Sequence, residues 1–421
     1  MAAAVAPAPS VAAEPTPPSP TPKVESPPPP TPWASTFVAV AEADGLPVVG
    51  RNLDGTVYAG EPSTIVAIDR RGRATKLDFN APDVPLYAHR PQWTLGAQEV
   101  LGVVGHGPNR VFVHVDYSAR MAARQRLFEV SARPARVGRF GANADVRGVW
   151  ALANGGVLVL GDDTRPGDFG PYSTRERFEV VGGASPGPRR TGVRRTEECP
   201  SGYPTIGDVH VSTDGTIQAI VGCEARRQIA TWAPGRRKAT RVALDTEHSP
   251  IDVVWGPEGD GWIVIRTDVP RLIRWHGGTL TEFPALDPYR GTLIRDADGR
   301  PWMFAPADRS SDAGLWRLED GDWRGVQLPP DRVEGLVGLE VGTPWAYGEV
   351  LWRYDLEQGW RPVTLPWSRG TLKILGLTMG GPDDVVMETT DGTRVRYGWI
   401  ESTGEPLSRW GGRQVWTNRA G

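Results

Sequence analysis

The sequence predicts an all-β fold built from repeated four-stranded antiparallel sheets. Composition is the first reason, because 51 Gly, 40 Pro and 17 Trp among 421 residues leave few uninterrupted stretches long enough for helices. The second reason is a repeat. The segments GLWRLEDGDWRGVQLP (314–329) and VLWRYDLEQGWRPVTLP (350–366) share Leu-Trp-Arg, an acidic turn, Trp-Arg and Leu-Pro. Such self-similarity indicates one structural unit stacked several times along the chain.

The N-terminal segment differs from the rest of the chain in composition. Residues 1–35 consist mainly of Ala, Pro, Ser, Thr and Val, and such a segment cannot bury enough apolar surface to fold. We therefore predict a disordered tether over 1–35 and a single folded domain over 36–421. The tether lacks the basic and apolar regions of a complete signal peptide, so we interpret it as a remnant that follows a signal or lipoprotein segment. A low-complexity start on a cytoplasmic protein is the alternative.

Each repeat unit opens with a first hairpin. It contains two short apolar strands around a turn marked by Gly, Asp or Pro, which is typical of a β-hairpin. The predicted first hairpins occupy 37–50, 100–115, 147–161, 207–221, 252–265, 291–305, 334–348 and 373–387.

A second hairpin follows each first one. It reads as a strand of alternating apolar residues, a turn containing Gly or Asp, and a returning strand. The predicted second hairpins occupy 64–77, 126–140, 177–190, 228–242, 271–283, 314–326, 350–363 and 394–407.

Two hairpins make one four-stranded sheet, and such a sheet buries both faces only by stacking on copies of itself. Closing the stack into a ring also protects the edges of the sheets. The sequence therefore predicts a β-propeller, with eight blades favoured and seven as the alternative. Terminal strands of a propeller often combine into one shared blade, and GGRQVWTNRAG (411–421) is a candidate closing strand.

Two motifs carry a family resemblance. DADGRPWMF (296–304) followed by GLWRLEDGDW resembles the repeats of bacterial regulator-type propellers, and WGPEGDGWIV (255–264) followed by LIRWHGGTLTEF resembles the Trp/Gly/Asp-rich repeats of secreted bacterial propellers. The resemblance covers about 250–366. It implies the fold and an extracytoplasmic sensing or binding role, and it brings no catalytic residues with it.

Charge and hydropathy exclude two classes of partner. The net charge of -3 and the pI near 6.1 provide no basic field to hold nucleic acid. No apolar run approaches the length of about 18 residues that a membrane-spanning helix needs, so we expect no transmembrane segment.

The repeated Trp and Arg residues admit two interpretations. Their recurrence at matching positions favours packing between blades over ligand stacking for the Trp residues, and a cross-blade salt bridge or a surface position for the Arg residues. The Trp residues are Trp316, Trp323, Trp352 and Trp360, and the Arg residues are Arg274, Arg317 and Arg353.

Three groups of residues are candidates for a site. Asp296 and Asp298 offer calcium two carboxylates but not the further oxygens of a full calcium loop, so calcium is a weak alternative and we expect no cofactor. Cys199 and Cys223 flank one hairpin and are predicted to form a disulfide, with two unlinked thiols as the alternative. A locally basic region predicts docking of an acidic partner surface, against the alternative of solvated edge loops, through Arg189, Arg190, Arg194 and Arg195.

These observations predict a non-catalytic, monomeric propeller that binds a protein or a glycan through the loops of one face. We expect it outside the cytoplasm, in the periplasm, on the outer surface or secreted, and possible tethering to the envelope follows from the N-terminal segment. The rival hypothesis is a propeller-fold glycoside hydrolase or lyase, which requires two carboxylates close together at the mouth of the central channel. A structural domain without its own ligand is the third hypothesis.

Overall fold

The computed structural model describes most of the chain beyond the N-terminal segment. The described residues are 32, 37–52, 54–87, 90–105, 110–117, 125–132, 135–139, 145–152, 155–162, 176–182, 191–192, 205–223, 226–236, 238–244, 250–265, 270–286, 291–307, 312–381, 383–392, 394–400, 405–410 and 413–419.

Eight four-stranded antiparallel sheets make up the described part of the chain. The first four are β2 (Val48–Arg51), β3 (Val57–Glu61), β4 (Thr64–Ile68) and β5 (Ala74–Leu77); β8 (Glu99–Gly105), β9 (Arg110–Asp116), β10 (Gln125–Ala132) and β11 (Ala135–Arg139); β12 (Asp145–Ala151), β13 (Gly156–Asp162), β14 (Glu176–Gly182) and β15 (Thr191–Gly192); and β16 (Thr205–Val211), β17 (Ile217–Cys223), β18 (Arg226–Trp232) and β19 (Thr240–Ala243).

The other four follow in chain order. They are β20 (Pro250–Trp255), β21 (Gly261–Ile265), β22 (Arg271–His276) and β23 (Thr279–Pro284); β24 (Thr292–Arg295), β25 (Pro301–Ala305), β26 (Gly314–Glu319) and β27 (Asp322–Gly325); β28 (Val333–Val337), β29 (Trp345–Gly348), β30 (Leu351–Asp355) and β31 (Gly359–Pro362); and β32 (Lys373–Gly381), β33 (Asp384–Thr390), β36 (Arg413–Thr417) and β1 (Val38–Ala39).

Four further elements lie outside these sheets. Two are separate hairpins and two are 3-10 helices of one turn. They are β6 (Val84–Tyr87) with β7 (Arg90–Leu95), β34 (Arg394–Ile400) with β35 (Glu405–Trp410), η1 (Ala41–Ala43) and η2 (Leu339–Val341). No helix among the described residues is long and apolar enough to cross a membrane.

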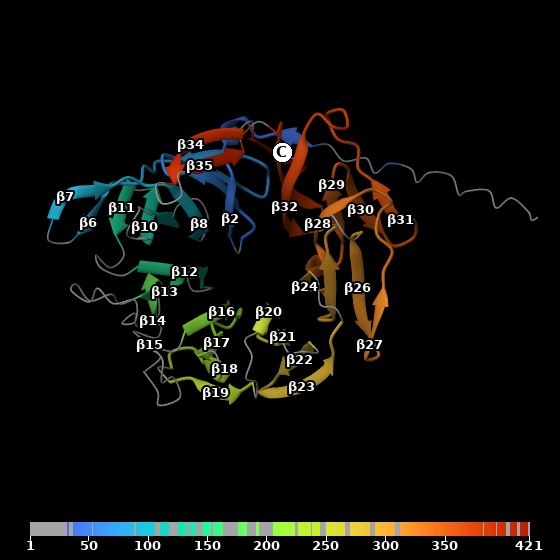
Figure 1. Cartoon of the computed structure of the whole chain (residues 1–421). Coiled ribbons are helices and arrows are strands. Elements are labelled where there is room, and N and C mark those ends of the chain that lie inside the picture. The colour runs from blue at the N-terminus through green and yellow to red at the C-terminus, as the bar shows by residue number, and fades with distance from the viewer. Residues whose placement is uncertain are drawn as a thin grey trace, which may run out of the picture.

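The sheets follow one another around a ring (Figure 1). Their first strands contact each other across neighbouring sheets, as β2 contacts β8, β12 contacts β16 and β20 contacts β24, so these strands line the centre. The chain is therefore an all-β β-propeller with four-stranded antiparallel blades, as the repeats predict.

The core consists of eight apolar clusters, each shared by two successive sheets. Tyr58 and Phe128, for example, belong to one cluster between the first and second sheets. Trp345 and Met387 belong to another between the seventh and eighth. The last cluster joins Val386 of the eighth sheet to Val57 of the first, which closes the ring. Burying both faces of every sheet in this way supplies the main stabilisation of the fold.

The repeated Arg residues stack on a Trp of their own sheet, and three of the repeated Trp residues pack against the neighbouring blade. In three consecutive sheets an Arg on the third strand pairs with a Trp on the second and stacks over its ring at 5.1–5.6 Å; the pairs are Arg274–Trp262, Arg317–Trp302 and Arg353–Trp345. Trp323 donates from Nε1 to the carbonyl of Pro284 in the preceding sheet, and Trp360 donates to that of Gln327, just beyond the preceding sheet, both at 2.9 Å. Trp352 is buried in the cluster between sheets six and seven. The packing interpretation is confirmed for these three Trp residues.

Two of the predicted hairpins are wrong. The segment 37–50 divides between two sheets, because β1 pairs with β36 while β2 opens the first sheet beside β3. The segment 394–407 forms the separate hairpin β34–β35, so its place in the eighth sheet is taken by β36. The prediction of a closing strand within 411–421 is confirmed by β36.

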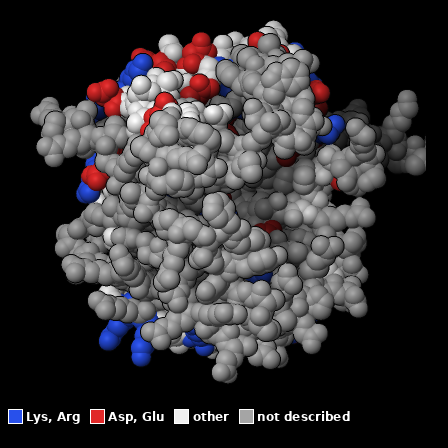
Figure 2. All heavy atoms as spheres, turned by 60° about the vertical axis from the view of Figure 1, so that its left-hand side comes forward, with Lys and Arg blue, Asp and Glu red and all other residues white. Residues whose placement is uncertain are grey.

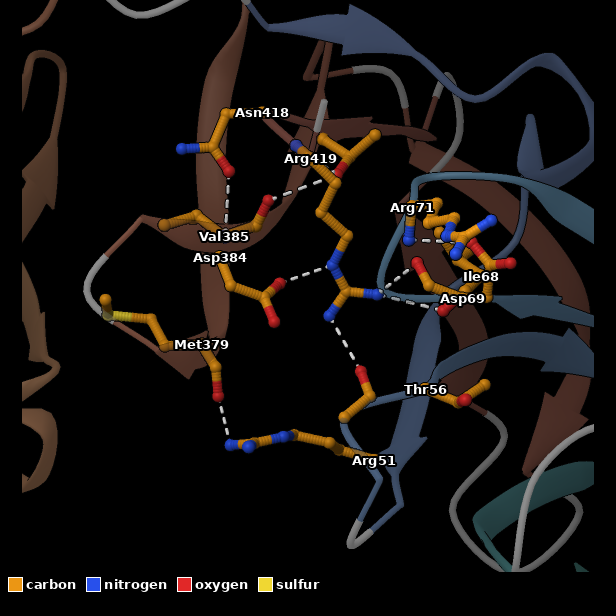
Figure 3. Close-up of polar contacts among 12 residues, drawn as sticks. Arg51, Thr56, Ile68, Asp69, Arg71, Met379, Asp384, Val385, Asn418 and Arg419 are labelled. Carbon is orange, nitrogen blue, oxygen red and sulfur yellow. Dashed lines mark hydrogen bonds and ion pairs between the residues drawn. The ribbon is translucent and has the colours of Figure 1, made fainter. Parts of the chain in front are cut away.

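A buried arginine adds a polar connection where the ring closes. The side chain of Arg419 is 1% exposed and forms an ion pair with Asp384 on β33. It also donates to three carbonyls of the first sheet at 2.8–2.9 Å, those of Gly55, Ile68 and Asp69 (Figure 3). Arg51 of the first sheet donates in turn to the carbonyl of Met379 in the eighth. The three bonds from Arg419 to carbonyls and the bond from Arg51 to Met379 join the first and last sheets, and the bond to Asp384 fixes the Arg419 guanidinium on the last sheet.

We expect Arg419→Met to destabilise the protein. The substitution removes a buried charge that carries an ion pair and three hydrogen bonds, and it leaves Asp384 and the three carbonyls without this donor. The free energy of unfolding should fall by about 3 kcal/mol, measured by chemical denaturation. The control is Arg71→Met, at an exposed turn position of the first sheet. Equal midpoints for the two variants would contradict the role of Arg419.

Candidate functional site

Most of the residues predicted to form a site lie outside the described residues. This applies to Arg189, Arg190, Arg194, Arg195 and Cys199. Cys223 ends β17, but only its backbone is described. The basic docking region and the disulfide therefore remain predictions.

The candidate calcium residues lie in the turn between β24 and β25. The Asp296 carboxylate accepts hydrogen bonds from the backbone N–H of Arg300 and from Nε1 of Trp302, both at 2.8 Å. Asp298 is paired with Arg300 at 3.7 Å. Within the described residues no group of three or more His, Cys, Asp or Glu is placed to hold a metal ion. These contacts favour a turn-stabilising role for Asp296, and the calcium alternative stays a prediction.

The two faces of the ring differ in their connections. Antiparallel pairing places the start of the first and third strands, and the end of the second and fourth, at one edge of each sheet. We call this edge the loop face and the opposite edge the turn face. The hairpins β6–β7 and β34–β35 both interrupt loop-face connections. The longest stretches of chain between consecutive described strands, 163–175 and 193–204, also start at this edge.

The first strands carry a repeated irregularity near their loop-face end. In seven of the eight sheets the pairing between the first and second strands shifts by one residue, which is the signature of a β-bulge. A bulge bends the strand and redirects a side chain. The shifts fall between Val48/Gly50, Val100/Gly102, Val146/Gly148, Gly207/His210, Pro250/Asp252, Val333/Gly335 and Ile374/Gly376.

A pocket of about 360 Å³ lies between two of these bulged strands, β8 and β12. Its apolar lining includes Leu101, which is 43% exposed, and the partly buried Val149 and Trp150. The polar side chains are those of His114, Gln125 and Arg147, and Arg147 is exposed; Gly102, Val104 and Gly148 complete the lining. No carboxylate is among these lining residues.

His114 is a polar anchor of this pocket and joins two sheets. Its Nε2 lies 3.1 Å from Oε1 of Gln125 on β10 and 3.1 Å from the carbonyl oxygen of Val146 on β12. A carbonyl oxygen only accepts, so Nε2 carries the proton. Burial lowers the pKa of His114 below its usual value, against the opposing effects of these two hydrogen bonds and of Asp116. The ring is therefore neutral at neutral pH.

Two carboxylates interact across the first strands of the fourth and fifth sheets. Asp208 and Asp252 stand at bulge positions where five other sheets have Gly. Asp208 keeps solvent contact, yet partial burial and the charge of Asp252 raise the pKa of its carboxyl, while Arg227 lowers it. Asp252 accepts a hydrogen bond from the backbone N–H of Leu293 at 2.6 Å. The arrangement therefore brings a carboxyl group with a raised pKa, that of Asp208, under the influence of a second carboxyl group, that of Asp252.

Aromatic contacts support this second region. Trp255 donates from Nε1 to the carbonyl oxygen of Asp208 at 2.7 Å and stacks on His210, with ring centroids 6.2 Å apart. Asp208 has a φ of 47°, which is unusual for a residue other than Gly. The indole of Trp255 thus ties the fifth sheet to the strained bulge of the fourth.

The sequence carries a signal for these bulges that repeat counting missed. The bulge coincides with a triplet made of a β-branched residue, any residue and Gly. The triplet reads VVG (48–50), VRG (146–148) and VEG (333–335). Its variants are IGD (206–208) and PID (250–252). Aligning the sheets on this triplet places Arg147 at its second position and Asp208 at its third. Comparing the side chains at this triplet from sheet to sheet would have identified both residues from the sequence.

Charged side chains of both signs are visible on one side of the molecule. Figure 2 turns the sheets at the left of Figure 1 toward the viewer. Among the described residues visible there, acidic and basic side chains mingle along the upper margin, and basic ones gather at the lower margin. This distribution accords with the net charge of -3.

Comparison with known proteins supports the fold class alone. No protein-family model and no curated protein matches the sequence. Among solved structures, the Dos1 propeller has a TM-score of 0.54 and 8% identity, covering 92% of this chain and 94% of that chain. The likeness identifies a β-propeller. The regulator-type and secreted repeat classes have no family match behind them and remain an interpretation of the motifs.

Weaker likenesses are found to other propellers. YCF48 from Cyanidioschyzon merolae gives a TM-score of 0.41 at 12% identity, covering 74% of this chain and 92% of that chain. Virginiamycin B lyase from Staphylococcus aureus gives 0.36 at 13% identity, covering 65% and 94%.

We expect the stability of the protein to fall as the pH is lowered through the ordinary histidine value of 6.5, partly because of His114. Its pKa is lower in the folded state, so the unfolded chain binds the proton more readily, and the full stabilisation is present only above the unfolded pKa. The fall in the unfolding midpoint from about pH 7.5 to about pH 5.5 should be smaller in His114→Gln than in the wild type. The control is His276→Gln, at an exposed position of β22. An unchanged pH dependence in His114→Gln would contradict this role.

Proposed function

We propose that this protein is a non-catalytic propeller that binds a protein partner through its loop face. The observation that carries the proposal is the concentration of features on one face. Both inserted hairpins, the longest connections, the seven bulges and the pocket between β8 and β12 all lie at the loop-face edge. Connections on a rigid scaffold are where binding residues concentrate, and the turn face has mainly short turns.

The chemistry of the pocket supports a protein partner over a glycan. Trp and Arg are the residue types most enriched among binding hot spots between proteins, and Trp150 and Arg147 occur together here. Nε2 of His114 is engaged with Gln125 Oε1 and with the Val146 carbonyl oxygen, and Leu101, Val149 and Trp150 supply apolar surface for a ligand. An extracytoplasmic setting, the tether over 1–35 and the disulfide between Cys199 and Cys223 are parts of the proposal that rest on sequence.

We also propose that the functional ring has eight blades, one for each four-stranded sheet. The support is the set of eight apolar clusters, each shared by two successive sheets and the last joining Val386 to Val57. The seven-bladed alternative would treat the sheet that contains both β1 and β36 as a closure element and not as a blade.

A photo-crosslinking amino acid placed on each face tests the proposed function. Leu101 on the loop face and Leu356 in a turn-face connection, 91% exposed, are the matched positions. We expect benzoylphenylalanine at Leu101, in the full chain in its native cell, to give a discrete crosslinked protein, and the same probe at Leu356 to give none. Mass spectrometry of the product separates a peptide adduct from a glycan adduct. Crosslinking only at Leu356 would overturn the assignment of the face.

The carboxylate pair favours a second candidate function, acid–base catalysis by a glycoside hydrolase or lyase. Such enzymes need one carboxyl group that holds its proton beside one that stays ionised. Burial and the charge of Asp252 raise the pKa of Asp208, which makes Asp208 the candidate for the group that holds its proton. The described pocket of 360 Å³ does not include them, which is why binding is preferred.

A panel of aryl glycosides and polyuronates decides between the two functions. On the binding proposal the protein turns over none of them. If it is an enzyme, one substrate is turned over, and Asp208→Asn should reduce the rate by a factor of about 100 or more. Asp298→Asn, at an exposed turn-face position, is the matched control and should leave any rate unchanged.

A further inference from the structure

We propose that His210 is a pH-operated contact between the fourth and fifth sheets, whose neutral ring holds Trp255 against Asp208 and whose protonation releases that indole. The contact lies among the first strands at the centre of the ring. We call His210, Gln218 and Trp255 the histidine cluster. The inference does not depend on the partner that the loop face binds.

The position of His210 gives it control over the indole. The ring of His210 on β16 stacks on that of Trp255 on β20, with centroids 6.2 Å apart and the two planes 24° from parallel. Trp255 in turn donates from Nε1 to the carbonyl oxygen of Asp208 at 2.7 Å. The imidazole therefore supports the indole that ties the fifth sheet to the bulge of the fourth.

The turn between β20 and β21 packs against the histidine cluster. The N–H of Thr213, in the next turn of the fourth sheet, donates to the Pro257 carbonyl oxygen in this turn at 3.3 Å. A Cβ atom on Gly259 would lie 2.5 Å from Oε1 of Gln218, so the backbone of the turn lies directly on that side chain. Gln218 is 6% exposed as a result.

The hydrogen bonds of His210 favour its neutral form. The ring is hydrogen-bonded to the backbone carbonyl of Pro257. Its Nε2 is buried and has no hydrogen-bond partner among the described residues, so the bond to Pro257 comes from Nδ1. Oε1 of Gln218, directly opposite His210 on β17, is also buried without a partner in the described part of the chain. A proton added at Nε2 would enter a buried position with no acceptor in contact.

Two charged groups from other sheets face the ring. Asp260, before β21, favours positive charge on His210, and Arg295 on β24 opposes it. These two groups are paired with each other at 3.1 Å. Burial is the largest effect, and it lowers the pKa of His210 below its usual value of 6.5.

The carboxylates of its own strand and turn are engaged elsewhere. Asp214 accepts hydrogen bonds from the backbone N–H and the hydroxyl of Thr216. The carboxyl of Asp208 interacts with Asp252 and Arg227. Neither carboxylate hydrogen-bonds to Nε2 of His210.

These contacts determine how the histidine cluster responds to acid. A released imidazole has the ordinary pKa of about 6.5 and is mostly protonated at about pH 5.5, whereas the packed ring binds the proton less readily. The released state therefore gains stability relative to the packed state as the pH falls through 6.5. The ratio of released to packed molecules should rise between about pH 7.5 and about pH 5.5, by about tenfold at most. Trp255 then loses the ring that supports it.

Hydrogen exchange of tryptophan indole N–H groups tests the inference, followed by NMR of the full chain with isotope-labelled tryptophan. The measured quantity is the exchange rate of Trp255 divided by that of Trp323, which is also half-buried and donates to a carbonyl of the preceding sheet at 2.9 Å. The ratio removes the intrinsic pH dependence of exchange. We expect it to rise about fivefold between about pH 7.5 and about pH 5.5. The rise should disappear in His210→Gln and remain in His276→Gln, at an exposed position of β22.

Titration of the His210 ring by NMR in the unaltered chain keeps the test independent of how the variant folds. A pKa below 6.5 together with the rising ratio supports the inference. A ratio that stays constant with pH, or a rise that persists in His210→Gln, would overturn it. A pKa at or above 6.5 would also overturn it, because the protonated Nε2 would then be stabilised in place, with Oε1 of Gln218 as its acceptor. None of these results bears on the proposed binding function.

Discussion

The packing of each sheet against its two neighbours is the interaction on which the rest of the structure depends. A four-stranded sheet of this composition has two apolar faces, and neither can be left in water. Residues such as Phe128 and Trp345 have almost no exposed surface only because the next sheet covers them. The arrangement is stable when the series has no free end, which means that the first and last sheets must meet. The Arg419 guanidinium and the β1–β36 pairing hold the chain at that junction.

Closure also explains why side chains from different sheets meet at the centre of the ring. The first strands approach one another there, so small changes at one strand position bring unlike groups together from different sheets. A Gly at the bulge lets a neighbouring ring lie flat, as at Gly148, whereas an Asp at the same place adds a charge that its neighbour feels, as at Asp208. One backbone irregularity, repeated around the ring, therefore supports an apolar pocket on one side and an acidic pair on another. On the proposed function, the binding chemistry of the loop face depends on which side chain each bulge carries.

Local sequence patterns predicted most of the strands. They did not predict the pairing of strands that are distant in the sequence. Hairpins such as 207–221 and 271–283 match β16–β17 and β22–β23, because alternation and turn residues are read from neighbours in sequence. The segment 37–50 was wrong, since the partner of Val38 is Thr417 and no local pattern specifies a partner at that distance. The hairpin β34–β35 has the same alternation as a blade hairpin, so periodicity could not exclude it from the eighth sheet.

The residues of the candidate site could be predicted from the sequence less well than the fold. His114 lies within the predicted first hairpin at 100–115 and is 7% exposed, but its contact with Val146 depends on how two sheets meet, which no local pattern specifies. Residue type alone does not distinguish Arg147 from the other arginines among 43, because its exposed position depends on the bulge. The side chains of the basic segment at 189–195 lie outside the described residues, so that candidate is neither supported nor contradicted.

The pairing of β1 with β36 has a consequence for the order in which the molecule is made. On the ribosome, Val38 and Ala39 emerge before all eight sheets, and their partners Thr417 and Trp416 emerge after seven of them. Until then Phe37, which is 4% exposed in the finished ring, has no apolar surface of the eighth sheet to cover it. Contacts so distant in sequence form slowly, and exposed apolar segments and strand edges invite association with other chains. A nascent chain of this protein therefore spends most of its synthesis as an open arc, and a chaperone that shields the early segment would act during that interval.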